Sequence, residues 1–237
     1  MIQNHTLKYK HLFFDLDHTL WDFERSSSES LTEVYHTFKI AELGAGPLDT
    51  FISTYLRINY QLWRELERNE IPHGHIREHR FRLVMEELGV QTPTNYAPME
   101  ETYIELLPTK SYLMEGALDV LDYVQAKGYT LHIVTNGFDV VQGKKMQSSG
   151  IYDYFTHLIT NEKAQSRKPD RRIFEYALAC ADAGCDECLM IGDNWEADIL
   201  GAKRFGLDTV YYNPEGSSFD EAPTHDIRHL RELLDIL

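Results

Sequence analysis

Short apolar runs recur along this chain, and each one ends in polar or glycine-containing residues. Runs that are apolar throughout, rather than alternating, are typical of strands buried on both faces of a parallel sheet. Segments of helical character separate the last four runs, which predicts a doubly wound α/β fold with right-handed crossovers. The predicted strands are residues 11–15, 131–137, 156–160, 188–194 and 209–213, with helices at 138–149, 171–183 and 197–205, followed by a short strand at 225–227 and a closing helix at 228–237.

The interval between the first two strands has a different pattern. Its apolar residues recur at three- and four-residue spacing, as in amphipathic helices, and no strand-like run interrupts them. Ser26, at the start of the first such stretch, is a candidate helix cap. Helices are therefore predicted at 26–40, 50–70, 75–90 and 98–108. The predicted organisation is a core of residues 1–20 and 108–237, with a helical domain of residues 21–107 inserted after the first strand.

Length and charge narrow the possible partners. The chain has 237 residues, 43% of them hydrophobic, which is enough to bury a full core. Its formal net charge of −15 argues against a nucleic-acid or anionic-membrane surface, because such ligands are bound by clustered lysine and arginine. The stretch MIQNHTLKYKHLFF lacks the long apolar region and the small-residue cleavage pattern of a secretion signal, and no window reaches the length that spans a bilayer. We therefore expect a cytoplasmic monomer or small homo-oligomer that binds neither nucleic acid nor membrane.

Polar side chains follow several of the predicted strands. Ligands of open α/β sheets bind outside the carboxyl ends of the strands, so these side chains are candidates for one site. Converging carboxylates repel each other unless a cation lies among them, and Mg²⁺ takes oxygen ligands of this kind. The candidates are Asp15, Asp17 and Thr19 after the first strand, Thr135, Asn136 and Gly137 after the second, Lys168 after the third, and Asp193, Asn194 and Asp198 after the fourth.

The acidic pair Asp15 and Asp17 suggests two different chemical roles. A carboxylate can act as a nucleophile and form an aspartyl-phosphate. A second carboxylic acid can protonate the leaving alkoxide and, once ionised, activate water for hydrolysis of that intermediate. For this purpose the pKa of Asp17 should lie above that of an ordinary aspartate. The pair therefore predicts phosphoryl-transfer chemistry at the end of the first strand.

Four motifs, DLDHT, VTNG, KPD and GDNWEAD, follow one another on the predicted elements. Together they resemble the four motifs of the haloacid dehalogenase-like hydrolase superfamily, over the whole chain. The resemblance implies a Rossmann-like core, a helical cap domain of the C1 type inserted between the first two motifs, Mg²⁺ as cofactor and a hydrolase activity. One acidic pair alone is a weak signal, whereas four motifs that each follow a strand are specific.

The resemblance also implies roles for the acidic residues. Asp15 matches the nucleophile, with one side-chain oxygen on the metal. Asp17 matches the general acid/base and also offers its backbone carbonyl to the metal. Asp193 matches the remaining carboxylate ligand of the metal.

Other motif residues match positions around the phosphate. Thr135 and the backbone of Asn136 match phosphate-binding positions, and Lys168 matches the catalytic lysine that neutralises nucleophile and phosphate. Asp198 matches an acidic position that supports Lys168 or the water shell of the metal, and Thr19 is a further supporting hydroxyl.

The motifs also bear on the substrate. The family's dehalogenases lack the acid that Asp17 matches, so its presence favours phosphate esters over haloacids. The stretch DLDHTLWDFERSS with the following insert resembles the bacterial 5′-nucleotidase branch that cleaves pyrimidine nucleoside monophosphates. We therefore predict a Mg²⁺-dependent 5′-nucleotidase. The alternatives are a phosphatase or mutase of small sugar or organic phosphates, and a non-catalytic phosphate-binding module, which the intact motifs argue against.

Trp21 and Phe23, directly after the first motif, are candidates for substrate contact. Their rings could stack on a nucleobase or pack the hinge between core and cap. The stretch IPHGHIREHRF offers a second candidate region. It could bind zinc, form a solvated turn and helix start, or act as the cap segment that selects the substrate, with Arg77 lending positive charge. Its remaining histidines and arginine are His73, His75, His79 and Arg80.

Overall fold

The computed structural model describes residues 8–72, 74–90 and 95–237. The chain divides into two compact units. The core unit runs up to Asp22 and resumes at Ser111–Leu237, and the helical unit is Phe23–Lys110. The insert predicted from the sequence was 21–107, so the helical unit begins two residues later and ends three residues later than that range.

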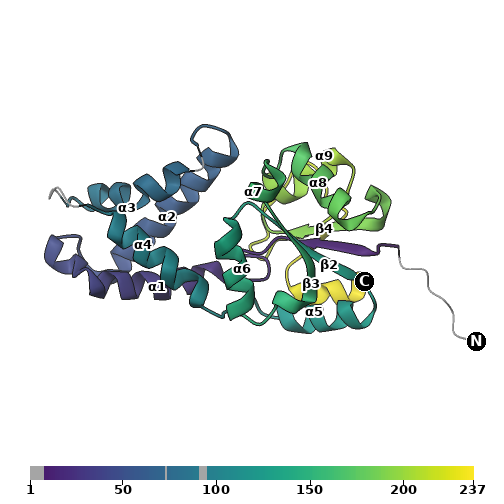
Figure 1. Cartoon of the computed structure of the whole chain (residues 1–237), viewed down its shortest axis with the longest axis horizontal. Helices are drawn as coiled ribbons and strands as arrows, with labels where there is room; N and C mark the ends of the chain where they lie inside the picture. Colours follow the sequence, from purple (N-terminus) through teal and green to yellow (C-terminus); the bar gives the residue numbers. More distant parts are fainter. Residues whose placement is uncertain (1–7, 73, 91–94) are drawn as a thin grey trace, which may run out of the picture. The chain divides into compact units, whose positions relative to one another are not determined.

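The core unit is built on one parallel sheet (Figure 1). In the described part of the chain this sheet has six strands, in the order β3-β2-β1-β4-β5-β6. Strand β1 pairs with β2 on one side and with β4 on the other, so the chain order reverses next to β1. Ligands of such sheets bind at this reversal. The strands are β1 (His11–Phe14), β2 (Thr130–Thr135), β3 (Phe155–Thr160), β4 (Cys188–Gly192), β5 (Asp208–Tyr212) and β6 (His225–Ile227).

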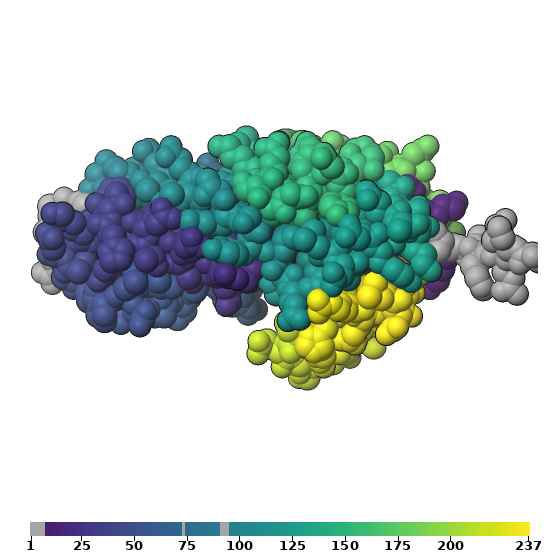
Figure 2. Space-filling model, turned by 90° about the horizontal axis from the view of Figure 1, so that it is seen from below, coloured from purple at the N-terminus to yellow at the C-terminus, as the bar shows by residue number. Residues whose placement is uncertain are grey.

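Helices cover both faces of the sheet, and the predicted doubly wound α/β fold is confirmed (Figure 1). Figure 2 shows the C-terminal segment, in yellow, against the teal surface that includes α5. There the hydroxyl of Tyr123 donates to the carbonyl of Leu234 at 3.3 Å. Helix α5 was not among the helices predicted from the sequence. The helices of the core unit are α5 (Ala117–Ala126), α6 (Asp139–Ser148), α7 (Asn161–Ala164), α8 (Arg171–Ala181), α9 (Gly201–Phe205) and α10 (Leu233–Ile236).

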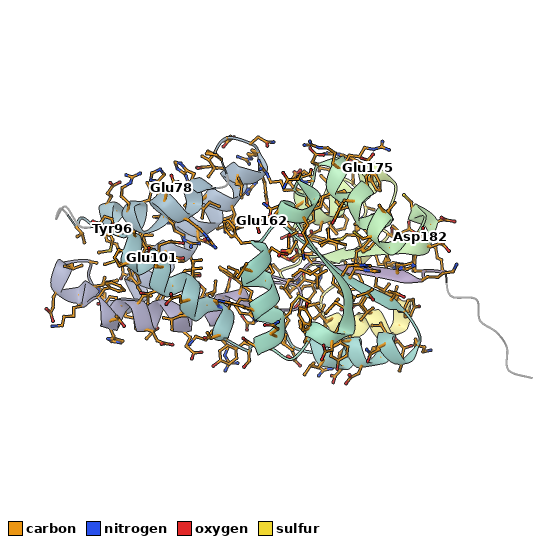
Figure 3. All side chains as sticks on the ribbon, viewed as in Figure 1. Glu78, Tyr96, Glu101, Glu162, Glu175 and Asp182 are labelled. Atoms are coloured by element: carbon orange, nitrogen blue, oxygen red, sulfur yellow. The ribbon has the colours of Figure 1, made fainter. Side chains whose placement is uncertain are left out.

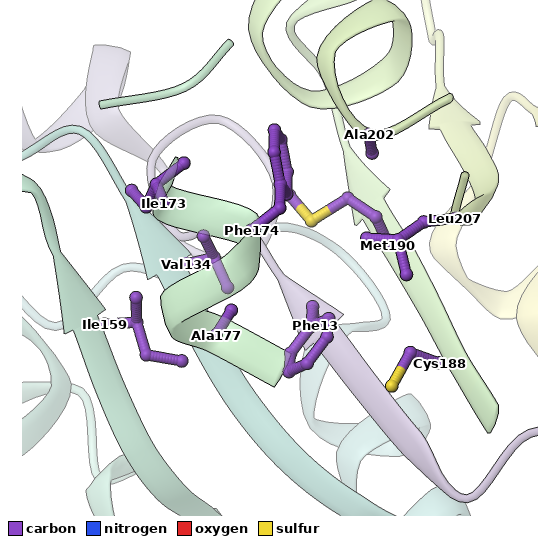
Figure 4. Close-up of a cluster of buried hydrophobic side chains, with 10 residues drawn as sticks. All are labelled: Phe13, Val134, Ile159, Ile173, Phe174, Ala177, Cys188, Met190, Ala202 and Leu207. Atoms are coloured by element: carbon purple, nitrogen blue, oxygen red, sulfur yellow. The ribbon is translucent and has the colours of Figure 1, made fainter. Parts of the chain in front are cut away.

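An apolar cluster joins the sheet to α8 (Figure 4). Phe13 of β1 and Val134 of β2 pack there with Ile173 and Phe174 of α8, and all four side chains are buried. Glu175 of the same helix is exposed on its outer side (Figure 3). This division of α8 into an apolar and a polar face anchors the central strands, which carry the acidic loops.

The helix predicted at 197–205 begins two residues earlier, and its first turn is wider than that of an α-helix. Trp195–Leu200 is a π-helix, which continues as α9. The carbonyl of Asn194 accepts from the N–H groups of Asp198 at 2.9 Å and Ile199 at 3.3 Å. The side chain of Asn194 accepts from the N–H of Ala197 at 3.0 Å and caps the turn. π-helical turns are frequent at functional sites, and this one carries a predicted site residue.

The helical unit contains the helices that the sequence predicted, with one correction. Ser26 does not cap the first of them, because α1 begins at Phe23 and Ser26 is buried within it. None of the helices in the described part of the chain has the length and apolar content needed to cross a membrane. The helices are α1 (Phe23–Thr37), α2 (Leu48–Glu67), α3 (Gly74–Glu87) and α4 (Ala97–Leu106).

A buried ion pair lies within the helical unit. Arg80 of α3 donates to Glu100 of α4, with 2.5 Å between Nη2 and Oε1, and to Oδ1 of Asn59 of α2 at 2.6 Å. Its guanidinium also lies over the rings of Tyr55 and Tyr103, 5.1 and 5.0 Å from their centroids. A buried charge is stable only with such partners. Arg80 therefore links α2, α3 and α4. Its place in the histidine-rich stretch is explained by this packing role.

Replacing Glu100 by Gln should reduce the free energy of unfolding by about 3 kcal/mol, because the Arg80 charge then stays buried without its counter-ion. Urea unfolding measures this loss. The exposed neighbour Glu101, replaced by Gln in the same way, is the matched control and should be neutral. Replacing both partners, as Arg80→Met with Glu100→Leu, should cost less than Glu100→Gln alone. Equal stability of the Glu100 and Glu101 variants would show that the ion pair does not contribute.

Three histidines form a row across the sheet. His132 of β2 lies between His11 of β1 and His157 of β3, with ring nitrogens 3.1 Å apart on each side. Only 1% of His132 is exposed. Burial, together with the two neighbouring imidazoles, lowers the pKa of His132 to about 3. His132 is therefore neutral in the folded protein at every pH near 7.

This row should make the protein sensitive to acid. An unfolded histidine titrates near pH 6.5, so the unfolded chain binds a proton at His132 below that pH while the folded chain does not. The contribution of His132 to the free energy of unfolding is therefore fully present above pH 6.5, and it should fall by about 1.4 kcal/mol per pH unit as the pH drops towards 3. Urea unfolding at pH 7 and pH 5 should show a smaller pH effect in His132→Gln than in the wild type. The exposed His229, replaced by Gln, should leave the pH effect unchanged; equal slopes in both variants would refute the argument.

Candidate active site

Strand register brings the acidic loops together at one edge of the sheet. Phe14 of β1 pairs with Ile191 of β4, and the N–H of Asp15 donates to the carbonyl of Ile191 at 2.9 Å. Asp15 and Asp193 therefore follow neighbouring strands at nearly the same level. Thr135 ends β2 on the other side of β1. The carboxyl ends of three adjacent strands thus contribute to one polar site.

A buried lysine, Lys168, lies between two aspartates. Its Nζ is 2.5 Å from Oδ1 of Asp15 and 2.6 Å from Oδ1 of Asp198, and it donates to the carbonyl of Val134 at 2.6 Å. Burial lowers the pKa of Lys168, but the two aspartates raise it more, so the pKa lies above the ordinary value. Lys168 therefore remains charged and supplies positive charge directly at Asp15.

Three carboxylates are close enough to share a metal ion. Ligand oxygens of Asp15, Asp193 and Asp198 lie within 4.8 Å of one another, and this is the one such group among the residues that the structure describes. Burial and the repulsion between the carboxylates together outweigh the lowering effect of Lys168, and they raise the pKa of Asp15 to about 7 and the pKa of Asp193 and of Asp198 to about 6. A cation would relieve this repulsion. The hydroxyl of Thr19 donates to Oδ1 of Asp193 at 2.8 Å and orients it. This all-oxygen donor set fits Mg²⁺.

The two predicted phosphate-binding residues are tied to their surroundings by side-chain hydrogen bonds. The amide of Asn136 donates to the carbonyl of Lys168 at 2.9 Å and accepts from its N–H at 2.8 Å. The hydroxyl oxygen of Thr135 accepts from the N–H of Gly137 at 3.1 Å and from Nε2 of Gln142 at 2.8 Å. Asn136 therefore fixes the segment that carries the buried lysine, and Thr135 is fixed to α6.

The carboxylate of Asp17 is held by α6 and is not part of the metal-binding group. Nζ of Lys145 lies 2.6 Å from Oδ1, and Nε2 of Gln142 lies 2.9 Å from Oδ2. Burial raises the pKa of Asp17, but the Lys145 ammonium and these hydrogen bonds together lower it more, so the pKa lies below the ordinary value. The prediction of a raised pKa for Asp17 is therefore wrong. The pattern of residues around Asp17 in sequence does not show that Lys145 lies beside this carboxyl.

Lys145 and Gln142 are candidate site residues that were not predicted from the sequence. Both lie on α6, which begins shortly after the VTNG motif. They are three positions apart, a spacing that places two side chains on the same face of a helix. A search for a cation to compensate Asp17, on the helix that follows the second motif, would have found them.

Glycines in two of the motifs leave room for site side chains. A Cβ on Gly192 would lie 2.2 Å from Oδ2 of Asp198, and a Cβ on Gly137 would lie 2.5 Å from Cδ of Gln142. Real Cβ atoms essentially never approach other atoms closer than 3.0 Å. These glycines are therefore required by close packing around the site.

The predicted substrate-contact residues fall in both units. Trp21 lies in the core unit, where its ring is buried and the Nζ of Lys145 is 4.5 Å from its centroid. Phe23 is the first residue of α1, and Arg77 lies on α3. Trp21 therefore lies beside Lys145, the residue that contacts Asp17. A contact with substrate remains a prediction for Trp21, Phe23 and Arg77.

The histidine-rich stretch is described only in part. His73 lies outside the described residues. The rings of His75 and His79 on α3 are 4.2 Å apart in an edge-to-face arrangement. Within the described residues these two histidines belong to no group of three candidate metal ligands.

Comparison with known proteins identifies the family. Residues 9–206 match the family model described as haloacid dehalogenase-like hydrolase. The chain therefore belongs to the haloacid dehalogenase-like hydrolase family. This identification confirms the resemblance seen in the four motifs, and it makes the protein a hydrolase whose acidic loops occupy the expected edge of the sheet.

Several known enzymes are similar to the chain over most of its length. Pyrimidine 5′-nucleotidase PynA of Streptococcus pneumoniae is 31% identical, over 97% of this chain and 95% of its own. Pyrimidine 5′-nucleotidase YjjG of Escherichia coli is 29% identical, over 98% of this chain and 99% of its own. Glyceraldehyde 3-phosphate phosphatase of Pyrococcus abyssi is 32% identical, over 86% of this chain and 81% of its own.

A solved structure of the same family has a similar fold. The crystal structure of the HAD-hydrolase YfnB from Bacillus subtilis, bound to magnesium, matches with a TM-score of 0.87 and 29% identity. The match covers 97% of this chain and 99% of YfnB. The similarity therefore includes both the parallel sheet and the inserted helices.

Replacing Gly192 by Ala should displace the carboxylate of Asp198, which is fully buried and lies where the new methyl group would stand. We expect Mg²⁺ affinity, measured by calorimetry, and hydrolysis to fall about 10- to 100-fold, as when the supporting partners of metal ligands are removed. Gly143→Ala is the matched control, because its nearest neighbour outside the helix backbone, Cδ2 of Leu158, lies at an ordinary 3.8 Å. If both variants bind Mg²⁺ like the wild type, the packing argument for Gly192 is wrong.

Proposed function

We propose that this protein is a Mg²⁺-dependent phosphomonoesterase that acts through an aspartyl-phosphate on Asp15. The observation that carries the proposal is the contact of Lys168 with both Asp15 and Asp198, in a group of carboxylates whose oxygens lie within 4.8 Å of one another. This arrangement combines a nucleophile, a cation for the substrate phosphate and a set of metal ligands. Bound to Asp15 and Asp193, Mg²⁺ would neutralise negative charge on the phosphate.

The side chains account for both halves of such a reaction. In the first step an oxygen of Asp15 attacks phosphorus, the bond from phosphorus to the ester oxygen breaks, and Asp17 gives that oxygen a proton. In the second step water attacks phosphorus, its proton passes to Asp17, and the bond to Asp15 breaks to release phosphate. Lys168 and the hydroxyl of Thr135 would bind the phosphate oxygens. The lowered pKa of Asp17 keeps its carboxylate ionised, which is the form that can accept a proton in the second step.

Pyrimidine nucleoside monophosphates are the proposed substrates. Support comes from PynA and YjjG, which are named pyrimidine 5′-nucleotidases and align over nearly the whole chain at 31% and 29% identity. Small sugar or organic phosphates are the second candidate, supported by the 32% identity to a glyceraldehyde 3-phosphate phosphatase. We assign the choice between them to the helical unit, as a cap domain that carries Phe23 and Arg77, together with Trp21.

Phosphate release from a panel of nucleoside monophosphates, sugar phosphates and an aryl phosphate tests both the proposed phosphatase activity and the proposed choice of substrate. With Mg²⁺ we expect pyrimidine nucleotides to give the highest kcat/KM, and EDTA or Asp15→Asn to remove activity by more than about 10³-fold, as for loss of a nucleophile. Glu101→Gln, a change at an exposed carboxylate of α4, controls for loss of charge alone. A folded, Mg²⁺-loaded protein that cleaves no ester would contradict the phosphatase proposal. Preference for a sugar phosphate would contradict only the nucleotidase assignment.

A further inference from the structure

The acid/base candidate Asp17 is held at both of its side-chain oxygens by one helix. Oδ1 accepts from Lys145 at 2.6 Å and Oδ2 accepts from Gln142 at 2.9 Å. Because both donors lie on the same face of α6, the carboxylate is fixed at two points and cannot rotate without breaking one of these bonds. The orientation of Asp17 is therefore set by α6.

The two donors are themselves fixed. Gln142 and Lys145 are only 1% and 3% exposed. Nε2 of Gln142 also donates to Thr135 at 2.8 Å, which links the acid/base to a phosphate-binding hydroxyl. Nζ of Lys145 lies 4.5 Å from the ring centroid of Trp21, a cation–π distance. A buried lysine is costly unless it is paired, and here its contacts are with groups of the proposed site.

We propose that Lys145 and Gln142 are positioning residues that hold Asp17 in the orientation from which it takes the proton of the attacking water. This inference rests on the proposed function, because it concerns the second step of that reaction. In this step the water oxygen bonds to phosphorus, its proton goes to an oxygen of Asp17, and the bond between phosphorus and Asp15 breaks. Alignment of the reacting groups contributes strongly to the rate of such a step, so loss of the two-point hold slows it.

The test uses p-nitrophenyl phosphate, because its leaving group departs without a proton and the first step then does not need Asp17. In Lys145→Met we expect kcat to fall about 10²-fold, the usual contribution of an acid/base group, and kcat/KM to fall less than about 10-fold. Stopped-flow measurement should show a burst of nitrophenolate that approaches one equivalent per site, since phosphorylated Asp15 accumulates. Lys144→Met is the matched control, because Lys144 is the exposed neighbour on the same helix, and it should behave like the wild type.

Two further variants separate positioning from folding. Lys145→Arg keeps the charge and should restore most of kcat, whereas a fold defect in Lys145→Met would appear as a lowered melting temperature and an equal loss of kcat and kcat/KM. Asp17→Asn combined with Lys145→Met should be no slower than Asp17→Asn alone, because Lys145 acts through Asp17. Loss of kcat without a burst, or a further loss in the double variant, would overturn the proposal. If the wild type hydrolyses the ester and Lys145→Met is unchanged, only the positioning proposal fails; if the folded wild type hydrolyses no ester, the proposed function fails.

Discussion

The site depends on the balance between buried negative charge and one buried ammonium. Asp15, Asp193 and Asp198 meet at the ends of β1 and β4, and Lys168 contacts two of them at 2.5 and 2.6 Å. These are charges that water would otherwise stabilise, so the fold must supply compensation from its own groups. Two features keep these charged groups in contact. Asn136 makes two hydrogen bonds to the backbone of Lys168, and Gly192 leaves space for the carboxylate of Asp198.

The same constraint explains how an acidic protein can attract a phosphate. With a formal net charge of −15, the surface as a whole repels anions, and attraction must come from a few groups at the site. Lys168 is one such group, and Lys145 is a second cation within the core unit, paired with Asp17. A divalent cation among the three carboxylates would add the positive charge that the residues themselves lack.

Much of this architecture follows from residue pattern. The fully apolar run before Asp15 predicts a strand buried on both faces of a parallel sheet. The motifs that end the other strands are predicted at the same edge, because parallel strands share one direction. Helix α5 was not predicted, although its buried residues Ala117, Val120, Leu121 and Val124 have the spacing of an amphipathic helix. The π-helix at Trp195–Leu200 was missed because a one-residue widening leaves no mark on apolar spacing. The pKa of Asp17 was misjudged because it depends on Lys145, which lies 128 positions away in sequence.

In the proposed function, β1 presents Asp15 as the nucleophile in a site whose metal ligands and cation are already assembled. A crystal structure of the protein with Mg²⁺ and beryllium trifluoride, a mimic of a phosphoryl group, would identify the residue that accepts the phosphoryl group. We expect density for beryllium trifluoride with its beryllium bonded to a side-chain oxygen of Asp15, with Mg²⁺ beside Asp15 and Asp193 and with Lys168 in contact with the fluorides. Beryllium bonded to another residue, or Mg²⁺ bound without Asp15, would rule out Asp15 as the nucleophile.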